Sequence, residues 1–155
     1  MIRIVSWWFI KLLIRLQFPK VQQLSTADLA AWLSDKNKEK PLLLDARTIE
    51  EYEVSHLLDA KIVPDRLKDL ADEGINYLTP IVVYCSVGYR SSAIARRLLS
   101  MGYKNVFNLD GSIFQWVNEN RPVYLEGKPV NKVHPYQKFW QHLLIDRHNS
   151  FLLSH

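Results

Sequence analysis

Short apolar runs alternate with amphipathic segments through the middle of this chain. Runs rich in Val, Ile and Leu, each bounded by polar or turn residues, predict buried strands. Between these runs, apolar residues recur at three- and four-residue spacing, which predicts helices with one buried face. The predicted strands span 42–46, 60–64, 80–85 and 105–111, and the predicted helices span 26–34, 48–55, 65–75, 89–101 and 112–120. Because alternating strands and helices form a parallel sheet covered by helices on both faces, we predict an α/β domain.

The first 20 residues have a different composition, rich in Trp, Ile and Leu and without an acidic residue. Arg3, Lys11 and Arg15 interrupt the apolar run, which is therefore too short to span a bilayer. On a helical wheel these cations share one arc, and the opposite arc holds Val5, Trp8, Phe9, Leu12, Leu13 and Leu16. The apolar residues that fall near the cations are Trp7, Ile10 and Ile14.

Two interpretations of this helix compete. Residues 1–18 suit a helix that lies on an anionic membrane surface, with its apolar arc in the lipid. They equally suit a terminal helix that packs on the domain or on a second subunit. A secretory signal fits less well, because no small-residue cleavage site follows the short apolar core.

The C-terminal part of the chain lies beyond the alternating region. Residues 121–135 contain prolines and predict an extended tail, and residues 135–148 predict a final helix. Tyr136, Phe139 and Trp140 fit either docking on another protein or packing across the domain's own surface.

The composition is that of one globular domain of 155 residues. We divide the chain into a hydrophobic basic helix at 1–20, a central domain at 21–124 and an extension at 125–155. The formal net charge is +4, but the Lys and Arg clusters are short, so nucleic-acid binding is not expected. One cysteine excludes an internal disulfide, and nothing demands an oxidising compartment. We therefore expect a cytoplasmic protein, peripheral to a membrane under the first interpretation of its N-terminal helix, and the sequence leaves the oligomeric state open.

The single cysteine, Cys85, ends the strongest predicted strand and precedes the helix at 89–101. Parallel α/β sheets bind ligands at the carboxyl ends of their strands, and a helix N-terminus attracts anions and favours a thiolate. Gly88 allows the amides of the turn to point inward, and Arg90 adds a cation. A lone cysteine at a strand end is usually buried and inert. Gly88 and Arg90 in the same turn instead favour a cradle for an anionic group that is bonded to sulfur or attacked by it.

Four motifs resemble those of the rhodanese (sulfurtransferase) family. CSVGYRS at 85–91 resembles the active-site loop of that family, Cys-x-x-Gly-x-Arg-Ser. The other three motifs are LLLDARTIEEY at 42–52, SHLLDAKIVP at 55–64 and GYKNVFNLDGSIFQW at 102–116. The resemblance covers about residues 24–123, with the motifs in the order and spacing of the family.

The resemblance implies a rhodanese-like fold and a catalytic Cys85. The thiolate would take sulfane sulfur from thiosulfate or a protein persulfide, and the resulting Cys85 persulfide would pass it to cyanide or a thiol. The residues implied to bind the substrate are Ser86, Val87, Gly88, Tyr89 and Arg90. No cofactor and no metal are implied. Asp45 and His56 are expected to hold turns by hydrogen bonds, and Arg47 to form an ion pair.

The sequence also departs from the family and leaves alternatives. Ser55, Asp59 and Asp110 stand where the family commonly has glycine, which predicts altered turns and intact chemistry. Rhodanese-like domains also serve as non-enzymatic protein-binding modules. Cysteine-dependent phosphatases and arsenate reductases have a similar loop, but the phosphatases place five residues between Cys and Arg. This chain has four, which makes a smaller cradle that suits sulfur better than phosphate.

Overall fold

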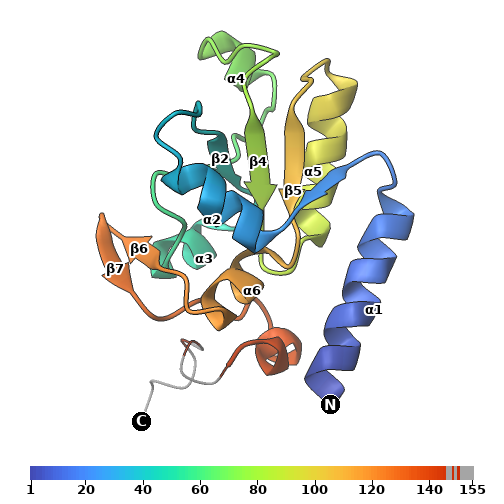
Figure 1. Ribbon diagram of the computed structural model, residues 1–155, viewed down its shortest axis with the longest axis vertical. Coiled ribbons are helices and arrows are strands. Elements are labelled where there is room, and N and C mark those ends of the chain that lie inside the picture. The colour runs from blue at the N-terminus through green and yellow to red at the C-terminus, as the bar shows by residue number, and fades with distance from the viewer. Residues whose placement is uncertain (146–147, 149, 151–155) are drawn as a thin grey trace.

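A five-stranded parallel sheet forms the centre of the molecule (Figure 1). The structure is a computed structural model that describes residues 1–145, 148 and 150. The strands are β1 (Gln22–Leu24), β2 (Leu42–Asp45), β3 (Lys61–Ile62), β4 (Ile81–Tyr84) and β5 (Val106–Leu109). They lie in the order β1-β5-β4-β2-β3, and every neighbouring pair is parallel. The predicted α/β architecture is confirmed, although the apolar pattern does not predict β1, because Gln22 and Gln23 are polar.

Helices cover both faces of this sheet. They are α1 (Ile2–Gln17), α2 (Thr26–Ser34), α3 (Ile49–Val54), α4 (Asp69–Asp72), α5 (Tyr89–Ser100) and α6 (Ser112–Asn118). Alternate residues of β4 serve the two faces: Ile81 and Val83 pack in a cluster with α1, α4 and α5, whereas Val82 and Tyr84 pack in a cluster with α2 and α6. A strand buried on both faces reads as a continuous apolar run, which is why this segment of the sequence is so hydrophobic.

Local sequence signals explain where two of these helices begin. The Ser25 hydroxyl accepts the Asp28 N–H at 3.0 Å and caps α2. Thr48 and Glu51 form a capping box at the start of α3. The helix predicted at 65–75 is shorter in the structure. The N–H groups of Asp69 and Leu70 bond carbonyls three residues earlier, as in a 3₁₀ turn, and α4 begins only at Asp69.

The C-terminal part differs from its predictions. The segment predicted as an extended tail contains a hairpin of β6 (Val123–Leu125) and β7 (Lys128–Val130). Its two turn residues, Glu126 and Gly127, both have positive φ, as a tight hairpin turn requires. The predicted final helix is a 3₁₀ helix, η1 (Lys138–Leu143), and residues 146 and 147 of that prediction lie outside the described residues. The Asn118 side chain bonds the backbone of residues 143 and 145, so α6 holds the chain where an α-helix would continue.

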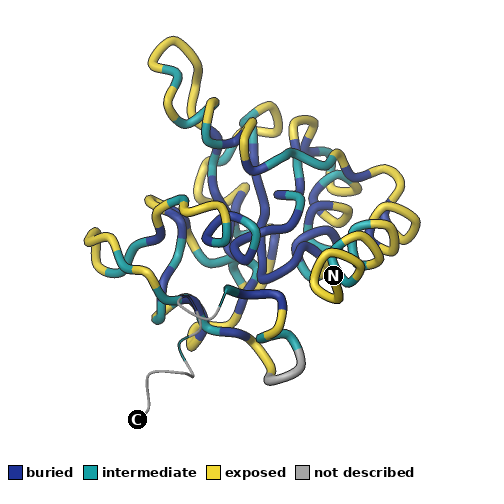
Figure 2. Tube along the Cα trace, turned by 60° about the horizontal axis from the view of Figure 1, so that its bottom comes forward, coloured by how far each residue is buried: buried dark blue, intermediate teal, exposed yellow. Residues whose placement is uncertain are grey.

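Helix α1 packs on the domain by the side of its wheel that carries the cations. Ile14 is buried, and Trp7 and Ile10 are partly buried in the core clusters. Lys11 and Arg15 lie 2.9 and 3.8 Å from a carboxylate oxygen of Asp110. The opposite, wholly apolar arc faces outward and is exposed (Figure 2). In the described part of the chain, no helix is long and apolar enough to cross a membrane.

Candidate active site

The predicted strand-to-helix turn is present, with Cys85 directly after β4 and Gly88 as the N-cap of α5. Cys85 is 1% exposed. Its Sγ accepts a hydrogen bond from the Gly88 N–H at 3.2 Å and lies 3.3 Å from the Ser91 hydroxyl, which donates to the Asn108 side-chain carbonyl. The first N–H groups of a helix have no partner within it, and here the N–H of the N-cap residue Gly88 donates to the sulfur. The sulfur therefore lies at the positive end of the α5 helix dipole.

The first turn of α6 holds this loop in place. The Cys85 N–H donates to the Ser112 hydroxyl at 3.1 Å. The N–H groups of Ile113 and Phe114 donate to the carbonyls of Cys85 and Ser86, each at 3.1 Å. The loop backbone is thus bonded on the side away from the sulfur, which leaves its inner amides in a defined position.

Gly88 occupies a backbone conformation that other residues rarely adopt. Its φ is +115°, and an added Cβ would lie 3.2 Å from Nδ2 of Asn108 and 3.4 Å from Cδ1 of Ile14. The positive φ therefore strains any side chain at this position, and an added Cβ would also require the Asn108 amide to shift by a few tenths of an ångström. The predicted role of Gly88 in curling the loop agrees with this geometry.

Arg90 adds a cation to the turn as expected, but it is held in an ion pair that the sequence analysis did not predict. Its Nη1 and Nη2 donate to the two carboxylate oxygens of Glu51 at 2.8 and 2.9 Å, and Nη2 also donates to the Ser86 hydroxyl at 2.9 Å. The ring of Tyr136 lies over the guanidinium at 4.0 Å. Burial lowers the pKa of Arg90, but the hydrogen bond to Glu51 and the nearby negative charges together outweigh burial, and the pKa is raised above its ordinary value.

Glu51 is the functional residue that the sequence analysis missed. Burial raises its pKa, but hydrogen bonds from Arg90 and from the Thr48 N–H, with the charge of Arg90, outweigh burial and lower the pKa to about 2. The carboxylate is therefore charged at neutral pH and compensates Arg90. Its place in a Thr-x-x-Glu capping box signals a helix start, and nothing in that motif indicates a contact 39 residues away.

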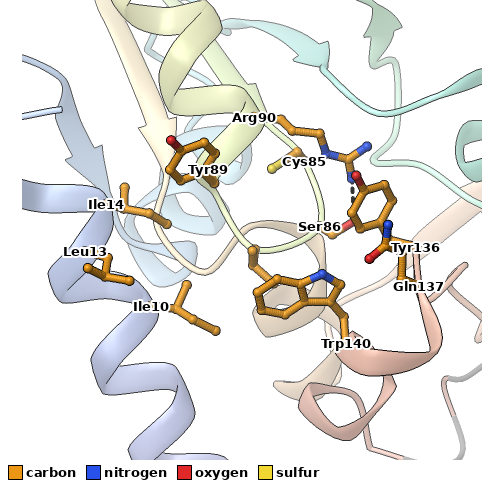
Figure 3. Close-up of a pocket in the computed structure, with 11 residues that line it drawn as sticks. Ile10, Leu13, Ile14, Cys85, Ser86, Tyr89, Arg90, Tyr136, Gln137 and Trp140 are labelled. Carbon is orange, nitrogen blue, oxygen red and sulfur yellow. Dashed lines mark hydrogen bonds between the residues drawn. The ribbon is translucent and has the colours of Figure 1, made fainter. Parts of the chain in front are cut away.

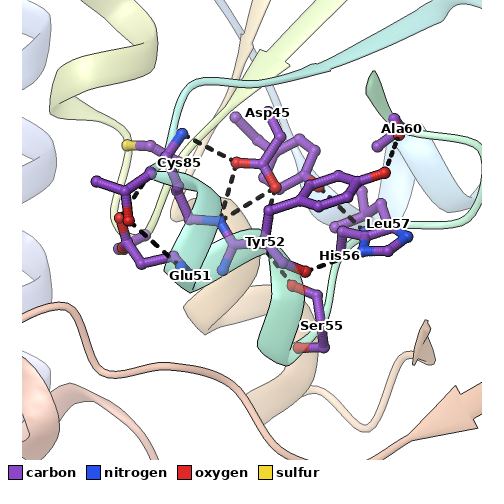
Figure 4. A network of polar contacts seen from close by, with 12 residues as sticks. Asp45, Glu51, Tyr52, Ser55, His56, Leu57, Ala60 and Cys85 are labelled. Atoms are coloured by element: carbon purple, nitrogen blue, oxygen red, sulfur yellow. Dashed lines mark hydrogen bonds and ion pairs between the residues drawn. The ribbon is translucent and has the colours of Figure 1, made fainter. Parts of the chain in front are cut away.

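A second buried network supports the loop from the neighbouring strand (Figure 4). Nη2 of Arg47 lies 2.7 Å from Asp45, and both side chains are fully buried. Burial lowers the pKa of Arg47, but the charge and hydrogen bonds of Asp45, with smaller contributions from other groups, outweigh burial. The net shift of the pKa is upward. The His56 ring stacks on Tyr52, and its Nδ1 donates to the Tyr52 carbonyl at 3.1 Å. The predicted ion pair of Arg47 is confirmed, and the contacts of Asp45 and His56 hold turns.

A cavity of about 380 Å³ opens above Cys85, between the loop and the two ends of the chain (Figure 3). Its volume is within the range of small-molecule sites. The loop residues that line it are Cys85, Ser86, Val87, Tyr89 and Arg90. The remaining lining residues come from α1 and from the segment around η1, and they are Ile10, Leu13, Ile14, Tyr136, Gln137 and Trp140. Both terminal segments therefore build the site, a role that the sequence analysis did not assign to either.

A model of the rhodanese-like domain matches residues 25–119 of the chain. The chain belongs to the rhodanese-like domain family. Among curated relatives, a tRNA uridine(34) hydroxylase of Chlamydia abortus is 28% identical over 93 residues, which are 55% of this chain and 28% of that protein. The adenylyltransferase and sulfurtransferase uba4 of Ogataea parapolymorpha is 32% identical over 88 residues, which are 54% of this chain and 23% of that protein. The chain thus spans less than a third of the length of these two relatives.

A solved structure shares the rhodanese-like fold. It is the polysulfide-sulfur transferase homodimer of Wolinella succinogenes, with a TM-score of 0.60, 22% identity, and coverage of 75% of this chain and 87% of that one. At this identity the likeness shows the fold alone. The curated relatives of this rhodanese-like chain therefore include a protein named as an adenylyltransferase and sulfurtransferase and one named as a hydroxylase.

The departures from glycine have structural reasons in this rhodanese-like chain. Asp59 has a φ of +60°, so it adopts the conformation for which glycine is usual. Ser55 has an extended backbone, and its hydroxyl donates to the Lys132 carbonyl at 2.6 Å. Asp110 binds Lys11 and Arg15, which ties α1 to the loop before α6. The departure from glycine at position 110 thus serves the attachment of α1 to the domain.

Proposed function

We propose that this protein is a sulfurtransferase that carries sulfane sulfur on Cys85. The observation that carries the proposal is the position of the sulfur, on the floor of a cavity and within hydrogen-bond distance of the Gly88 N–H and the Ser91 hydroxyl. The Gly88 N–H can donate to a thiolate before the reaction and to a persulfide after it. The sulfurtransferases among its rhodanese-like relatives support the same activity.

The chemistry consists of two half-reactions. In the first, the Cys85 thiolate attacks the outer sulfur of thiosulfate, the new S–S bond forms, and sulfite leaves with the electron pair of the broken bond. In the second, cyanide or a thiolate attacks the outer sulfur of the persulfide. The products are thiocyanate or a new persulfide, and the Cys85 thiolate is restored. We expect ping-pong kinetics, and a reducing compartment such as the cytoplasm keeps the thiol available.

Intact-protein mass spectrometry tests this proposal directly. The reduced protein is incubated with thiosulfate or with a polysulfide, and its mass is compared with that of Cys85→Ser, which removes the one thiol of the chain. We expect a gain of one sulfur, about 32 Da, in the wild type alone, and its loss after cyanide is added. Circular dichroism of Cys85→Ser shows whether the variant is folded.

Two results would overturn the proposal. If neither donor adds sulfur to the folded wild type, the chain is a binding module rather than a sulfurtransferase. If Cys85→Ser gains the same mass, the sulfur is not on Cys85. Release of phosphate from an aryl phosphate by the wild type would favour the phosphatase alternative.

A further inference from the structure

The cavity above Cys85 has walls that are unusually apolar for an anion site. Helix α1 contributes Ile10, Leu13 and Ile14, and the segment on the opposite side contributes Tyr136 and Trp140. Figure 3 shows these two groups of side chains facing each other, with the cysteine loop between them. A substrate that reaches the sulfur therefore passes between hydrocarbon and aromatic surfaces.

The charges that line the cavity favour neither an anionic nor a cationic substrate. Arg90 is the only cationic side chain among the described residues that line it. Glu51 compensates that charge through two hydrogen bonds, and the side chain of Glu51 is 1% exposed. The Tyr136 ring covers the guanidinium and makes a cation–π interaction with it, so this face of Arg90 is also occupied. A dianionic substrate would gain little from Arg90 here, whereas an apolar body would gain from leaving water.

We propose that the sulfur acceptor of this protein is a thiol with an apolar body, such as an alkyl or aryl thiol. The inference rests on the proposed function. The thiolate of the acceptor attacks the outer sulfur of the Cys85 persulfide and becomes a persulfide itself. The Cys85 sulfur leaves as a thiolate with the electron pair of the broken S–S bond, so no external oxidant or reductant is consumed.

Discharge kinetics with a series of thiols test this proposal. The protein is first loaded with sulfur, and the loss of the persulfide is then followed by mass spectrometry with straight-chain alkanethiols of increasing length, at equal thiolate concentration. Burial of one methylene favours binding by a factor of about three to four, so we expect the second-order rate constant to rise about threefold per carbon until the cavity is filled. Glutathione, which is charged and polar, is expected to react more slowly than hexanethiol.

Helix α1 offers a matched pair of variants for this experiment. Leu13 lines the cavity and is 46% exposed, whereas Leu12 is 37% exposed and lies outside it. Leu13→Asn is expected to flatten the dependence on chain length, and Leu12→Asn to leave it unchanged. Discharge by cyanide, which has no apolar body, is the internal reference: the ratio of the hexanethiol to the cyanide rate constant is expected to fall in Leu13→Asn and to stay at the wild-type value in Leu12→Asn.

The outcomes separate the two proposals. Rate constants that do not depend on chain length, or equal effects of Leu12→Asn and Leu13→Asn, would overturn the inference while cyanide discharge still supports the sulfurtransferase. Failure to load sulfur at all would overturn the proposed function instead.

A second and independent observation concerns the outer face of α1. Its exposed apolar side chains are Val5, Trp8, Phe9, Leu12 and Leu16, of which Leu16 is 69% exposed. Residues 1–20 hold four Lys and Arg and no acidic residue, whereas the rest of the chain carries 16 cationic and 16 acidic residues. The whole formal net charge of the protein thus lies on the segment that exposes this face.

We infer that this face of α1 docks on an anionic lipid surface. Asp110 binds Lys11, but Arg3, Arg15 and Lys20 of the same segment are exposed. Exposed Trp, Phe and Leu together with exposed cations are the pattern of an interfacial helix. The charge argues against a second copy of the chain as the occupant, because two such helices would bring like charges together. Docked in this way, the helix that lines the cavity also lies at the lipid surface, where apolar thiols concentrate.

Sedimentation with vesicles tests this docking. We expect the protein to bind vesicles of phosphatidylcholine with phosphatidylglycerol, and to bind vesicles of phosphatidylcholine alone much more weakly. The double variant Trp8→Ser, Phe9→Ser is expected to lose at least about tenfold in partitioning. Leu78→Ser is the matched control, because Leu78 is 66% exposed on the loop before β4.

A pair of charge variants separates a local effect from net charge. Arg3→Glu with Lys20→Glu is expected to weaken binding, whereas Lys36→Glu with Lys40→Glu, an equal change elsewhere, is expected to have little effect. Equal losses in both double variants, or binding that does not depend on phosphatidylglycerol, would overturn the inference. So would a lipid-free dimer that the substitutions at positions 8 and 9 convert to a monomer, because a second copy would then cover the face.

Discussion

Glu51→Gln is the substitution with the most definite expected effect on stability. Both carboxylate oxygens accept from Arg90, and one of them also accepts from the Ser86 hydroxyl at 3.0 Å. The other accepts the Thr48 N–H at 3.0 Å. Glutamine keeps the shape of the side chain and removes the charge, so the substitution isolates the electrostatic part of this network.

The size of the effect follows from the pKa of Glu51. The pKa is about 2 in the folded protein against an ordinary value of 4.5, and one unit corresponds to about 1.4 kcal/mol. The Arg90 side chain is 27% exposed, and screening by water reduces its contribution. We therefore expect the charge of Glu51 to contribute about 2 to 3 kcal/mol to the free energy of unfolding at neutral pH.

The sign of the pH dependence is fixed by the direction of this shift. Because the folded pKa is depressed, the stabilisation is fully present above the unfolded pKa of about 4.5 and is lost as the pH falls towards 2. The wild type and Glu51→Gln should therefore differ by about 2 to 3 kcal/mol at about pH 7 and by less than about 1 kcal/mol near pH 2.

Urea unfolding at several pH values measures this difference. Glu53→Gln on the same helix is the control, because Glu53 is exposed, and it is expected to change little at any pH. A difference between wild type and Glu51→Gln that is equally large near pH 2 and near pH 7 would refute the electrostatic reasoning, since the cost would then come from packing or from the lost cap.

Three other substitutions test separate parts of the structure. Asp45→Ala leaves a fully buried arginine without its ion-pair partner and should cost about 3 to 5 kcal/mol in urea unfolding, and a cost below about 1 kcal/mol would contradict this. Gly88→Ala should slow sulfur loading at least about tenfold, whereas Gly127→Ala, also at positive φ but with open space around it, should cost similar stability and leave loading unchanged. Asp110→Ala removes the carboxylate that binds Lys11 and Arg15, so hydrogen exchange should speed up in α1 and stay constant in β4, at a cost of about 1 kcal/mol. Equal exchange in α1 before and after the substitution would show that apolar packing alone holds the helix.

Local patterns in the sequence determined the central domain and its reactive loop. The continuous apolar run at 81–84 predicts a strand buried on both faces, and Thr48 with Glu51 predicts the start of α3. Cys85, Gly88 and Arg90 lie close together in the chain, so one turn brings them to one place whatever surrounds it. Each of these predictions depends on residues a few positions apart, where backbone geometry alone sets the relation.

The tertiary structure alone decided how the site is charged and what encloses it. Glu51 meets Arg90 across 39 positions, so the compensation of the loop cation depends on how β2 and β4 pair and where α3 lies. The walls of the cavity come from α1 and from residues 136–140, which are far apart in the chain. A helical wheel shows that α1 has two unlike arcs, but it does not say which arc faces the domain. Asp110, Ile10 and Ile14 settle that choice, because contacts between distant segments depend on packing.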